Sequence, residues 1–219
     1  MDRKIVVGIT QGDGNGIGYE VIIKALADER MLEICTPVIY GSSKLFGFYK
    51  KTLHNIEQIN TNVITSVDDV NPKMVNIVNC LPDSVYVEPG QPTPESAKCA
   101  LKALECAVND AKKGKIDVLV TAPFNKKAMH EEGFAFTGHT EFLEKEFNVK
   151  EVVMLMVADQ LKVAVATQHI PLRDVPKSLN KNMLVEKLRL MKESLEQDFG
   201  IYDPKIAVLG LNPHCGDSG

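Results

Sequence analysis

The chain has 219 residues, enough for one large domain or two modest lobes. Its hydrophobic content of 44% and charged content of 25% are ordinary for a globular protein. No apolar run reaches the roughly 20 residues needed to cross a bilayer. A net charge of −4 gives no electrostatic reason to expect nucleic acid or an anionic membrane as a partner.

Apolar, strand-like runs alternate with helical patterns along the first part of the chain. Ser42 and Thr93 are suited to cap the second and third of the predicted helices, and Gly114 to end the third. The run at 116–120 is almost entirely apolar, which predicts a strand buried on both faces. Strands are predicted at 5–10, 37–40, 62–65, 75–79 and 116–120, and helices at 18–27, 42–53 and 94–113.

The second part of the chain continues in the same manner. A helix is predicted at 141–147, and two strands at 152–158 and 161–167 surround Asp159-Gln160. A helix at 182–199 and a strand at 206–211 follow. The alternation favours an α/β protein with layers of helices around a largely parallel sheet.

The five cysteines are odd in number and contain no Cys-x-x-Cys pair. We therefore expect free thiols, which are typical of a reducing cytoplasm. The N-terminal apolar segment is interrupted too soon by glycines to be a signal peptide. Together these features predict a cytoplasmic location.

A glycine-rich loop at 12–18 lies between the first predicted strand and helix, with Asp13 as its candidate ligand-binding residue. Its spacing is not that of a dinucleotide fingerprint, because Ile17 and Tyr19 occupy positions that need glycine. It is not a P-loop either, since no Gly-Lys-Ser/Thr follows. The loop can hold an anion on the N–H groups of the helix start, or it can simply be a tight turn.

Two further polar segments are candidates for substrate binding. Lys126 and Lys127 follow the predicted strand at 116–120, and ligands of open α/β sheets lie beyond the carboxyl ends of strands. Either lysine could bind a phosphate, or both could be solvated. His139 and Thr140 begin a predicted helix, where they could bind a carboxylate or phosphate, although a histidine near a helix cap is more often structural.

Two histidines are candidate metal ligands, because each follows the end of a separate predicted strand. His169 follows the strand at 161–167, and His214 follows the strand at 206–211. Converging imidazoles suit Zn²⁺, Co²⁺ or Mn²⁺, although the spacing alone does not require a metal. His54 and His130 lie among charged residues of helical segments and are predicted to be surface residues.

Taken in order, five short segments resemble the 4-hydroxythreonine-4-phosphate dehydrogenase family. Each is short, but together they stay in register across essentially the whole chain, which makes the resemblance specific. The segments are residues 9–13 with 16–18, residues 121–123 with Lys126, and residues 136–141, 168–176 and 210–214.

The resemblance implies a fold like that of isocitrate and isopropylmalate dehydrogenases, with two α/β/α lobes, an active site in the cleft and a homodimer. The first lobe is expected at 1–130 and the second at 131–219. Both are expected to be incomplete, because the family places a third metal histidine, further substrate-binding residues and most NAD contacts downstream of Gly219. The C-terminal part of the fold is thus expected to be missing.

The resemblance also implies roles for individual residues. His139 and Thr140 match the family's substrate-binding pair, and His169 and His214 match two of its metal ligands. Lys126 is carried over as a possible ligand, but Asn125 stands where the family has histidine. The family's first loop has prolines where this chain has Gly14 and Tyr19, which predicts a looser loop. No residue is assigned a catalytic role.

The implied activity is oxidation of 4-phosphohydroxy-L-threonine by NAD or NADP, with a divalent metal such as Zn, Mg, Co or Mn. The product is a 3-oxo acid that decarboxylates to 3-amino-2-oxopropyl phosphate, in pyridoxine (vitamin B6) biosynthesis. One alternative is a dehydrogenase of a phosphorylated sugar acid such as 4-phospho-erythronate. Another is a truncated, non-catalytic dimerisation or phosphate-binding module.

Overall fold

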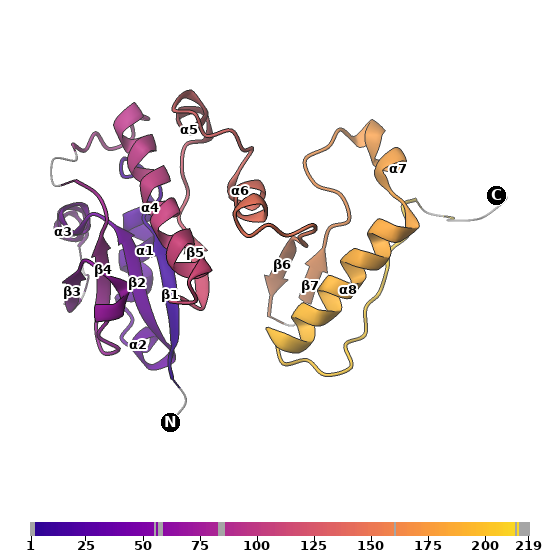
Figure 1. Ribbon diagram of the computed structural model, residues 1–219, viewed down its shortest axis with the longest axis horizontal. Helices are drawn as coiled ribbons and strands as arrows, with labels where there is room; N and C mark the ends of the chain where they lie inside the picture. Colours follow the sequence, from indigo (N-terminus) through magenta and orange to yellow (C-terminus); the bar gives the residue numbers. More distant parts are fainter. Residues whose placement is uncertain are drawn as a thin grey trace. The chain divides into compact units, whose positions relative to one another are not determined.

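The computed structural model describes residues 3–54, 56, 59–82, 86–159, 161–212 and 214. The chain divides into two compact units, Met1–Phe147 and Asn148–Gly219. Both contain strands and helices (Figure 1).

The first unit is built on a parallel five-stranded sheet in the order β3-β4-β2-β1-β5. This confirms the α/β fold with a parallel sheet that the alternating pattern predicts. The strands are β1 Ile5–Thr10, β2 Cys35–Gly41, β3 Thr61–Ile64, β4 Val75–Asn79 and β5 Val118–Thr121.

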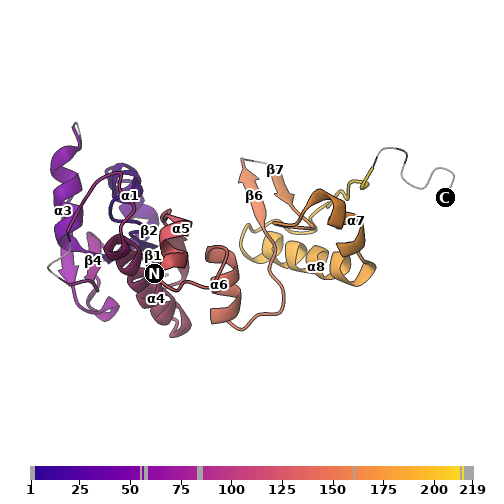
Figure 2. The same cartoon turned by 90° about the horizontal axis from the view of Figure 1, so that it is seen from above.

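Helices cover both faces of this sheet, as Figures 1 and 2 show. Because strand side chains alternate between the faces, Ile39 and Ile77 pack with α1 and α3, whereas Val38 and Tyr40 pack on the side of α4. The helices of this unit are α1 Gly18–Leu26, α2 Met31–Ile34, α3 Ser43–Thr52, α4 Pro94–Lys112, α5 Lys126–Glu131 and α6 His139–Glu146, with a 3₁₀ turn at Val67–Asp69.

The predicted helix ends of α3 and α4 are confirmed. Ser42 Oγ accepts a hydrogen bond from the Leu45 N–H group at 3.3 Å. Thr93 and Ser96 form a reciprocal capping box at the start of α4. Gly114 follows α4 with a φ of +68°, a conformation that favours glycine.

α5 and α6 extend the layer formed by α4. Buried side chains of the three helices and the intervening loop form one cluster, which includes Leu104, Val108, Met129, Phe134 and Phe142. This cluster holds the start of α6 against α4, and with it the predicted substrate-binding residues His139 and Thr140.

The prediction that residues 116–120 are buried on both faces is wrong. β5 lies at the edge of the sheet, and Val118 and Val120 are each 46% exposed. Ile116 is buried on the α4 side. An apolar run indicates that a strand can be buried, but it does not predict whether that strand lies in the centre or at the edge of its sheet.

The second unit contains the antiparallel pair β6 Leu155–Ala158 and β7 Leu161–Ala164, with α7 Val175–Ser178, α8 Lys181–Gln197 and a 3₁₀ turn at Leu172–Asp174. Both strands are shorter than predicted. Their antiparallel pairing departs from the predicted parallel arrangement, because a parallel pair needs a crossover of about a dozen residues and only two separate these strands. Asn180 caps α8.

The prediction of a strand at 206–211 is wrong, because this segment has no regular secondary structure. Val208 and Leu209 are 64% and 90% exposed. A strand exists only through hydrogen bonds with a neighbouring strand, and among the described residues none pairs with this segment.

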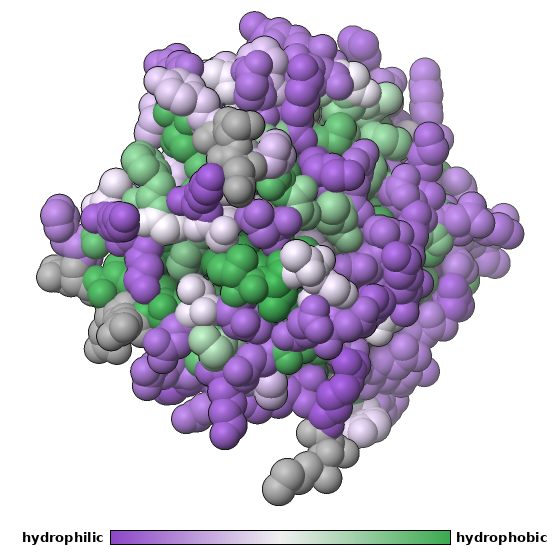
Figure 3. All heavy atoms as spheres, turned by 60° about the vertical axis from the view of Figure 1, so that its left-hand side comes forward, coloured by the Kyte–Doolittle hydropathy of each residue, from purple (hydrophilic) through white to green (hydrophobic). Residues whose placement is uncertain are grey.

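The face drawn in Figure 3 is mostly hydrophilic, with apolar side chains gathered near its middle. In the part of the chain that the structure describes, no helix combines the length and apolar character of a membrane span.

The glycine-rich loop after β1 lies directly against the segment after β5. The Asp13 N–H group donates to the Pro123 carbonyl at 3.0 Å. Gly12 has a φ of +67°, and a Cβ there would lie 2.4 Å from the Pro123 oxygen. The carboxyl ends of these neighbouring parallel strands lie at the same edge of the sheet, and the absence of a side chain at residue 12 lets the two backbones come into contact there.

Side-chain hydrogen bonds hold this loop, which the resemblance predicts to be looser. Asn15 Nδ2 donates to the Gln91 carbonyl at 2.9 Å, and its Oδ1 accepts from the Glu88 N–H group at 2.9 Å. The Tyr19 hydroxyl donates to Gln11 Oε1 at 2.7 Å, and burial raises the pKa of Tyr19 so that it stays protonated. Three side-chain hydrogen bonds thus anchor the loop.

We expect Gly12→Ala to lower the free energy of unfolding by at least about 1–2 kcal/mol, because alanine disfavours a positive φ and its methyl group would clash with the Pro123 oxygen. Gly47→Ala is the matched control: it lies inside α3 with no atom within 4 Å of the new Cβ, so it should stabilise by about 0.5–1 kcal/mol. Urea unfolding measures both. A Gly12→Ala protein as stable as the unsubstituted one would contradict the contact.

Candidate active site

The segment after β5 leads into α5 and brings Lys126 to the first position of that helix. Asn125 caps the helix, because its Oδ1 accepts from the Ala128 N–H group at 3.0 Å. This capping bond gives asparagine a structural role at the position where the family has histidine. Lys126 is exposed at the helix start.

The structure brings Lys126 close to the start of α6. A Cβ built on Gly138, the residue before α6, would lie 3.7 Å from Lys126 Nζ and 3.5 Å from Glu141 Oε2. No side chain caps this helix. The ammonium group and the N–H groups of the first turn favour negative charge beside His139 and Thr140, and the Glu141 carboxylate at the same helix start offsets part of this effect.

His139 and Thr140 are both half-buried. The Phe124 ring lies against the His139 imidazole, with 4.1 Å between ring centroids and 38° between ring planes. Burial, and then the positive charge of Lys126, lowers the pKa of His139. Because the ordinary pKa of histidine is about 6.5, the imidazole is neutral at pH 7 and can both accept and donate a hydrogen bond.

Asp13 makes contacts both within its own loop and with the segment after β5. Its Oδ1 accepts from the Asn15 N–H group at 2.9 Å, so the carboxylate stabilises its own loop. Its peptide N–H contacts Pro123, three residues before Lys126. The backbone of Asp13 thus connects the glycine-rich loop to the segment that carries Lys126. Its carboxylate accepts one hydrogen bond within the loop.

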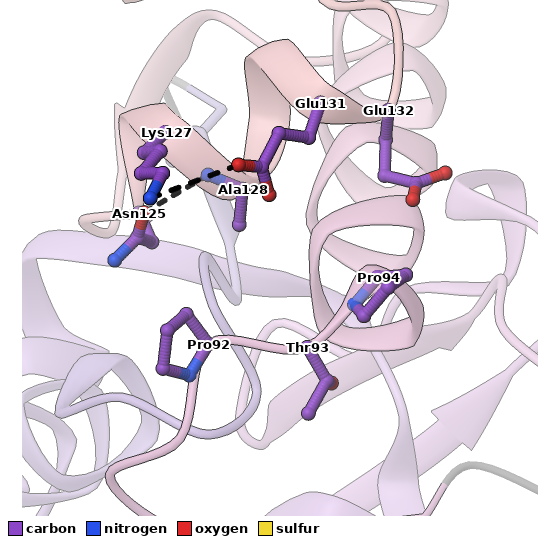
Figure 4. Close-up of a pocket in the computed structure, with 8 residues that line it drawn as sticks. All are labelled: Pro92, Thr93, Pro94, Asn125, Lys127, Ala128, Glu131 and Glu132. Carbon is purple, nitrogen blue, oxygen red and sulfur yellow. Dashed lines mark hydrogen bonds and ion pairs between the residues drawn. The ribbon is translucent and has the colours of Figure 1, made fainter.

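A cavity of about 290 Å³ lies between the start of α4 and α5 (Figure 4). It contains neither Lys126 nor His139, although Asn125 and Lys127 line it. Lys127 forms a 3.9 Å ion pair with Glu131, and Glu132 lies on the same wall. Glu132 pairs with Lys98 at 3.1 Å, so the two ion pairs leave no excess positive charge on this wall to attract the phosphorylated ligand that the resemblance implies.

The two predicted metal ligands, His169 and His214, lie in the second unit and are exposed. Neither follows a strand directly: His169 lies five residues past β7, and the strand predicted before His214 does not form. Both have a positive φ, +52° and +57°, which is uncommon for residues other than glycine, although histidine adopts it more often than most. Among the described residues, no group of three or more His, Cys, Asp or Glu side chains could hold a metal ion.

Nothing in the described part of the chain assigns the remaining histidines or cysteines to this site. His54 and His130 are exposed, as predicted. The four cysteines in the described ranges carry free thiols, and Cys215 lies outside those ranges. Sequence reasoning missed Phe124 and Asn15, because an aromatic contact or a bond to a distant loop leaves no periodic signal.

Comparison with known proteins identifies the family. Residues 33–219 match the family described as pyridoxal phosphate biosynthetic protein PdxA. A 4-hydroxythreonine-4-phosphate dehydrogenase of Bacteroides thetaiotaomicron is 45% identical over all of this chain and 60% of its own length. A protein of Oceanobacillus iheyensis, 31% identical over all of this chain and 66% of its own, is provisionally named a D-threonate 4-phosphate dehydrogenase.

Solved structures agree with these relatives. A 4-hydroxythreonine-4-phosphate dehydrogenase of Burkholderia phymatum is similar with a TM-score of 0.83 and 30% identity, covering 98% of this chain and 65% of that one. The chain thus spans about 60–66% of the length of these proteins. Because the family match covers far more than half of the residues, the chain belongs to the PdxA family of pyridoxal phosphate biosynthetic proteins.

Proposed function

We propose that this protein functions as a 4-hydroxythreonine-4-phosphate dehydrogenase. It would oxidise 4-phosphohydroxy-L-threonine with NAD or NADP and a divalent metal, in pyridoxine biosynthesis. The observation that carries the proposal is the cluster of Lys126, His139 and Thr140 at the start of α6, in a chain of the PdxA family.

The chemistry of this cluster suits a phosphorylated hydroxy acid. The Lys126 ammonium group and the N–H groups of the first turn of α6 favour an anionic group, either phosphate or carboxylate. The neutral His139 imidazole can accept a hydrogen bond from a hydroxyl group, and Thr140 supplies both a donor and an acceptor. The cluster would therefore bind and orient the substrate.

His169 and His214 would supply two of the metal ligands. Their imidazoles fit Zn, Co or Mn chemically, but two exposed ligands do not complete a coordination shell, so other groups must complete it. When bound, a divalent metal lowers the pKa of a coordinated hydroxyl group and stabilises negative charge on oxygen. The nicotinamide would accept the hydride.

The wider architecture is part of the same proposal. The two lobes stay a prediction at 1–130 and 131–219, whereas the compact units of the structure divide after Phe147. The exposed Val118 and Val120 of β5 are suited to an additional neighbouring strand. A homodimer and a cytoplasmic location stay predictions that rest on the family resemblance and the cysteine content.

A second candidate substrate is a phosphorylated sugar acid. The provisional name of the Oceanobacillus iheyensis relative favours it, since that name refers to D-threonate 4-phosphate. A sugar acid of this kind differs from 4-phosphohydroxy-L-threonine in having a hydroxyl group in place of the amino group. Lys126 and His139 recognise features that both substrates share, so the amino group is the feature that must decide between them.

For the metal, we expect His169→Ala and His214→Ala each to lose the bound divalent ion while the protein stays folded, because each removes a ligand from an exposed position. Metal content after dialysis measures this, with circular dichroism to check folding. His54→Ala, an equally exposed histidine, is the control and should retain the metal. Full metal content in either test variant would remove that residue from the metal site.

For the substrate, we expect His139→Ala to weaken binding of 4-phosphohydroxy-L-threonine by about tenfold, the effect of one lost hydrogen bond of about 1.4 kcal/mol. Metal content should not change. Isothermal titration calorimetry measures the affinity, with His130→Ala on α5 as the exposed control. An unchanged affinity in His139→Ala would exclude His139 from the substrate site. Tighter binding of 4-phospho-erythronate by the unsubstituted protein would favour the sugar acid.

A further inference from the structure

The contact between Phe124 and His139 joins two segments that are separate in the sequence. Phe124 belongs to the segment after β5, and His139 begins α6. Their ring centroids are 4.1 Å apart, and the rings are inclined by 38°. At this distance one face of the imidazole is covered by the phenyl ring, so water and ligands are excluded from that face.

Phe124 is itself held in place by other aromatic rings. It meets Phe134 edge-on, with centroids 5.6 Å apart and 75° between planes. Phe134 is buried and contacts Phe142, which lies on α6 one turn after His139. The chain of contacts therefore begins and ends on α6, and a rotation of the imidazole would have to displace rings that are packed from several sides.

Two charged groups lie beside His139 on the elements packed around it. Lys126 is on α5 and Glu141 is on α6, and both approach the backbone at Gly138. Lys126 acts on the imidazole charge in the same direction as burial, and both lower the pKa of His139. Glu141 is not without a partner of its own.

We propose that Phe124 is a positioning residue of the substrate site, whose ring covers one face of the His139 imidazole and fixes the edge that His139 presents to a hydroxyl group of the ligand. The orientation follows from the packing of unit 1 alone. Its consequence for ligand binding rests on the proposed function.

Burial, to which the Phe124 ring contributes, also lowers the pH at which His139 becomes protonated. A protonated imidazole has two donors and no acceptor, so it cannot accept a hydrogen bond from a hydroxyl group. The lowered pKa keeps the imidazole neutral as the pH falls, and the acceptor is lost only below that lowered value. If Phe124 is removed, water reaches the open face and the pKa rises, so the acceptor is lost at a higher pH.

The test uses Phe124→Leu and Phe124→Ala, with Phe136→Leu as the matched control. Phe136 belongs to the same aromatic cluster, where it contacts Phe134 and Phe142. The leucine variant preserves most of the packing volume if the alanine variant unfolds. The measurement is an NMR titration of the His139 ring protons in the whole protein. It does not require the protein to be enzymatically active.

We expect the pKa of His139 to rise toward the ordinary histidine value in both Phe124 variants, more in alanine than in leucine, and to stay unchanged in Phe136→Leu. The unsubstituted protein should also show nuclear Overhauser contacts between the Phe124 and His139 rings. An unchanged His139 titration in both Phe124 variants, or the same shift in Phe136→Leu, would overturn the proposal.

The pH dependence of ligand affinity provides a second readout. In Phe124→Leu, binding of 4-phosphohydroxy-L-threonine should be lost at a higher pH than in the unsubstituted protein, while affinity well above the pKa falls only a few-fold. If the unsubstituted protein does not bind this ligand at any pH, the proposed function fails. The NMR titration still decides whether Phe124 positions His139. A shifted His139 pKa with an unchanged pH profile of binding would overturn the ligand-facing role.

Discussion

The candidate site depends on the contact between the ends of β1 and β5. The Asp13 N–H group donates to the Pro123 carbonyl, and only a glycine at residue 12 allows the two backbones to approach so closely. This contact fixes where the segment after β5 leaves the sheet. The positions of Phe124 and Lys126, and through them the surroundings of His139, follow from it.

From this constraint the electrostatics of the site follow in order. The capped start of α5 presents Lys126 toward the start of α6, so an ammonium group and the N–H groups of the first turn lie beside one histidine, together with the Glu141 carboxylate. The aromatic cluster removes that histidine from water on one side. The resulting arrangement combines attraction for an anion with a neutral hydrogen-bond acceptor, and a phosphorylated hydroxy acid carries the groups that match both.

Much of the first unit could be predicted from local patterns, because alternating apolar runs and capping residues such as Ser42 and Thr93 act over short distances. The edge position of β5 could not be predicted from such patterns, because it depends on whether another strand pairs with β5. The antiparallel pairing of β6 and β7 could have been predicted, because the connection between them is too short for a parallel crossover. The strand predicted at 206–211 does not form, because no described strand pairs with it. At the site, the motifs identified Lys126 and His139, whereas their proximity and the role of Phe124 arise only from the packing of α4, α5 and α6.

The most direct test is to map 4-phosphohydroxy-L-threonine onto the protein by backbone amide NMR. We predict that the largest chemical-shift changes fall on Lys126, His139 and Thr140, and that they decrease with added salt because an anion is bound. Changes centred on the cavity lined by Thr93 and Glu131, or the absence of changes at the start of α6 when the ligand is bound elsewhere, would contradict the account.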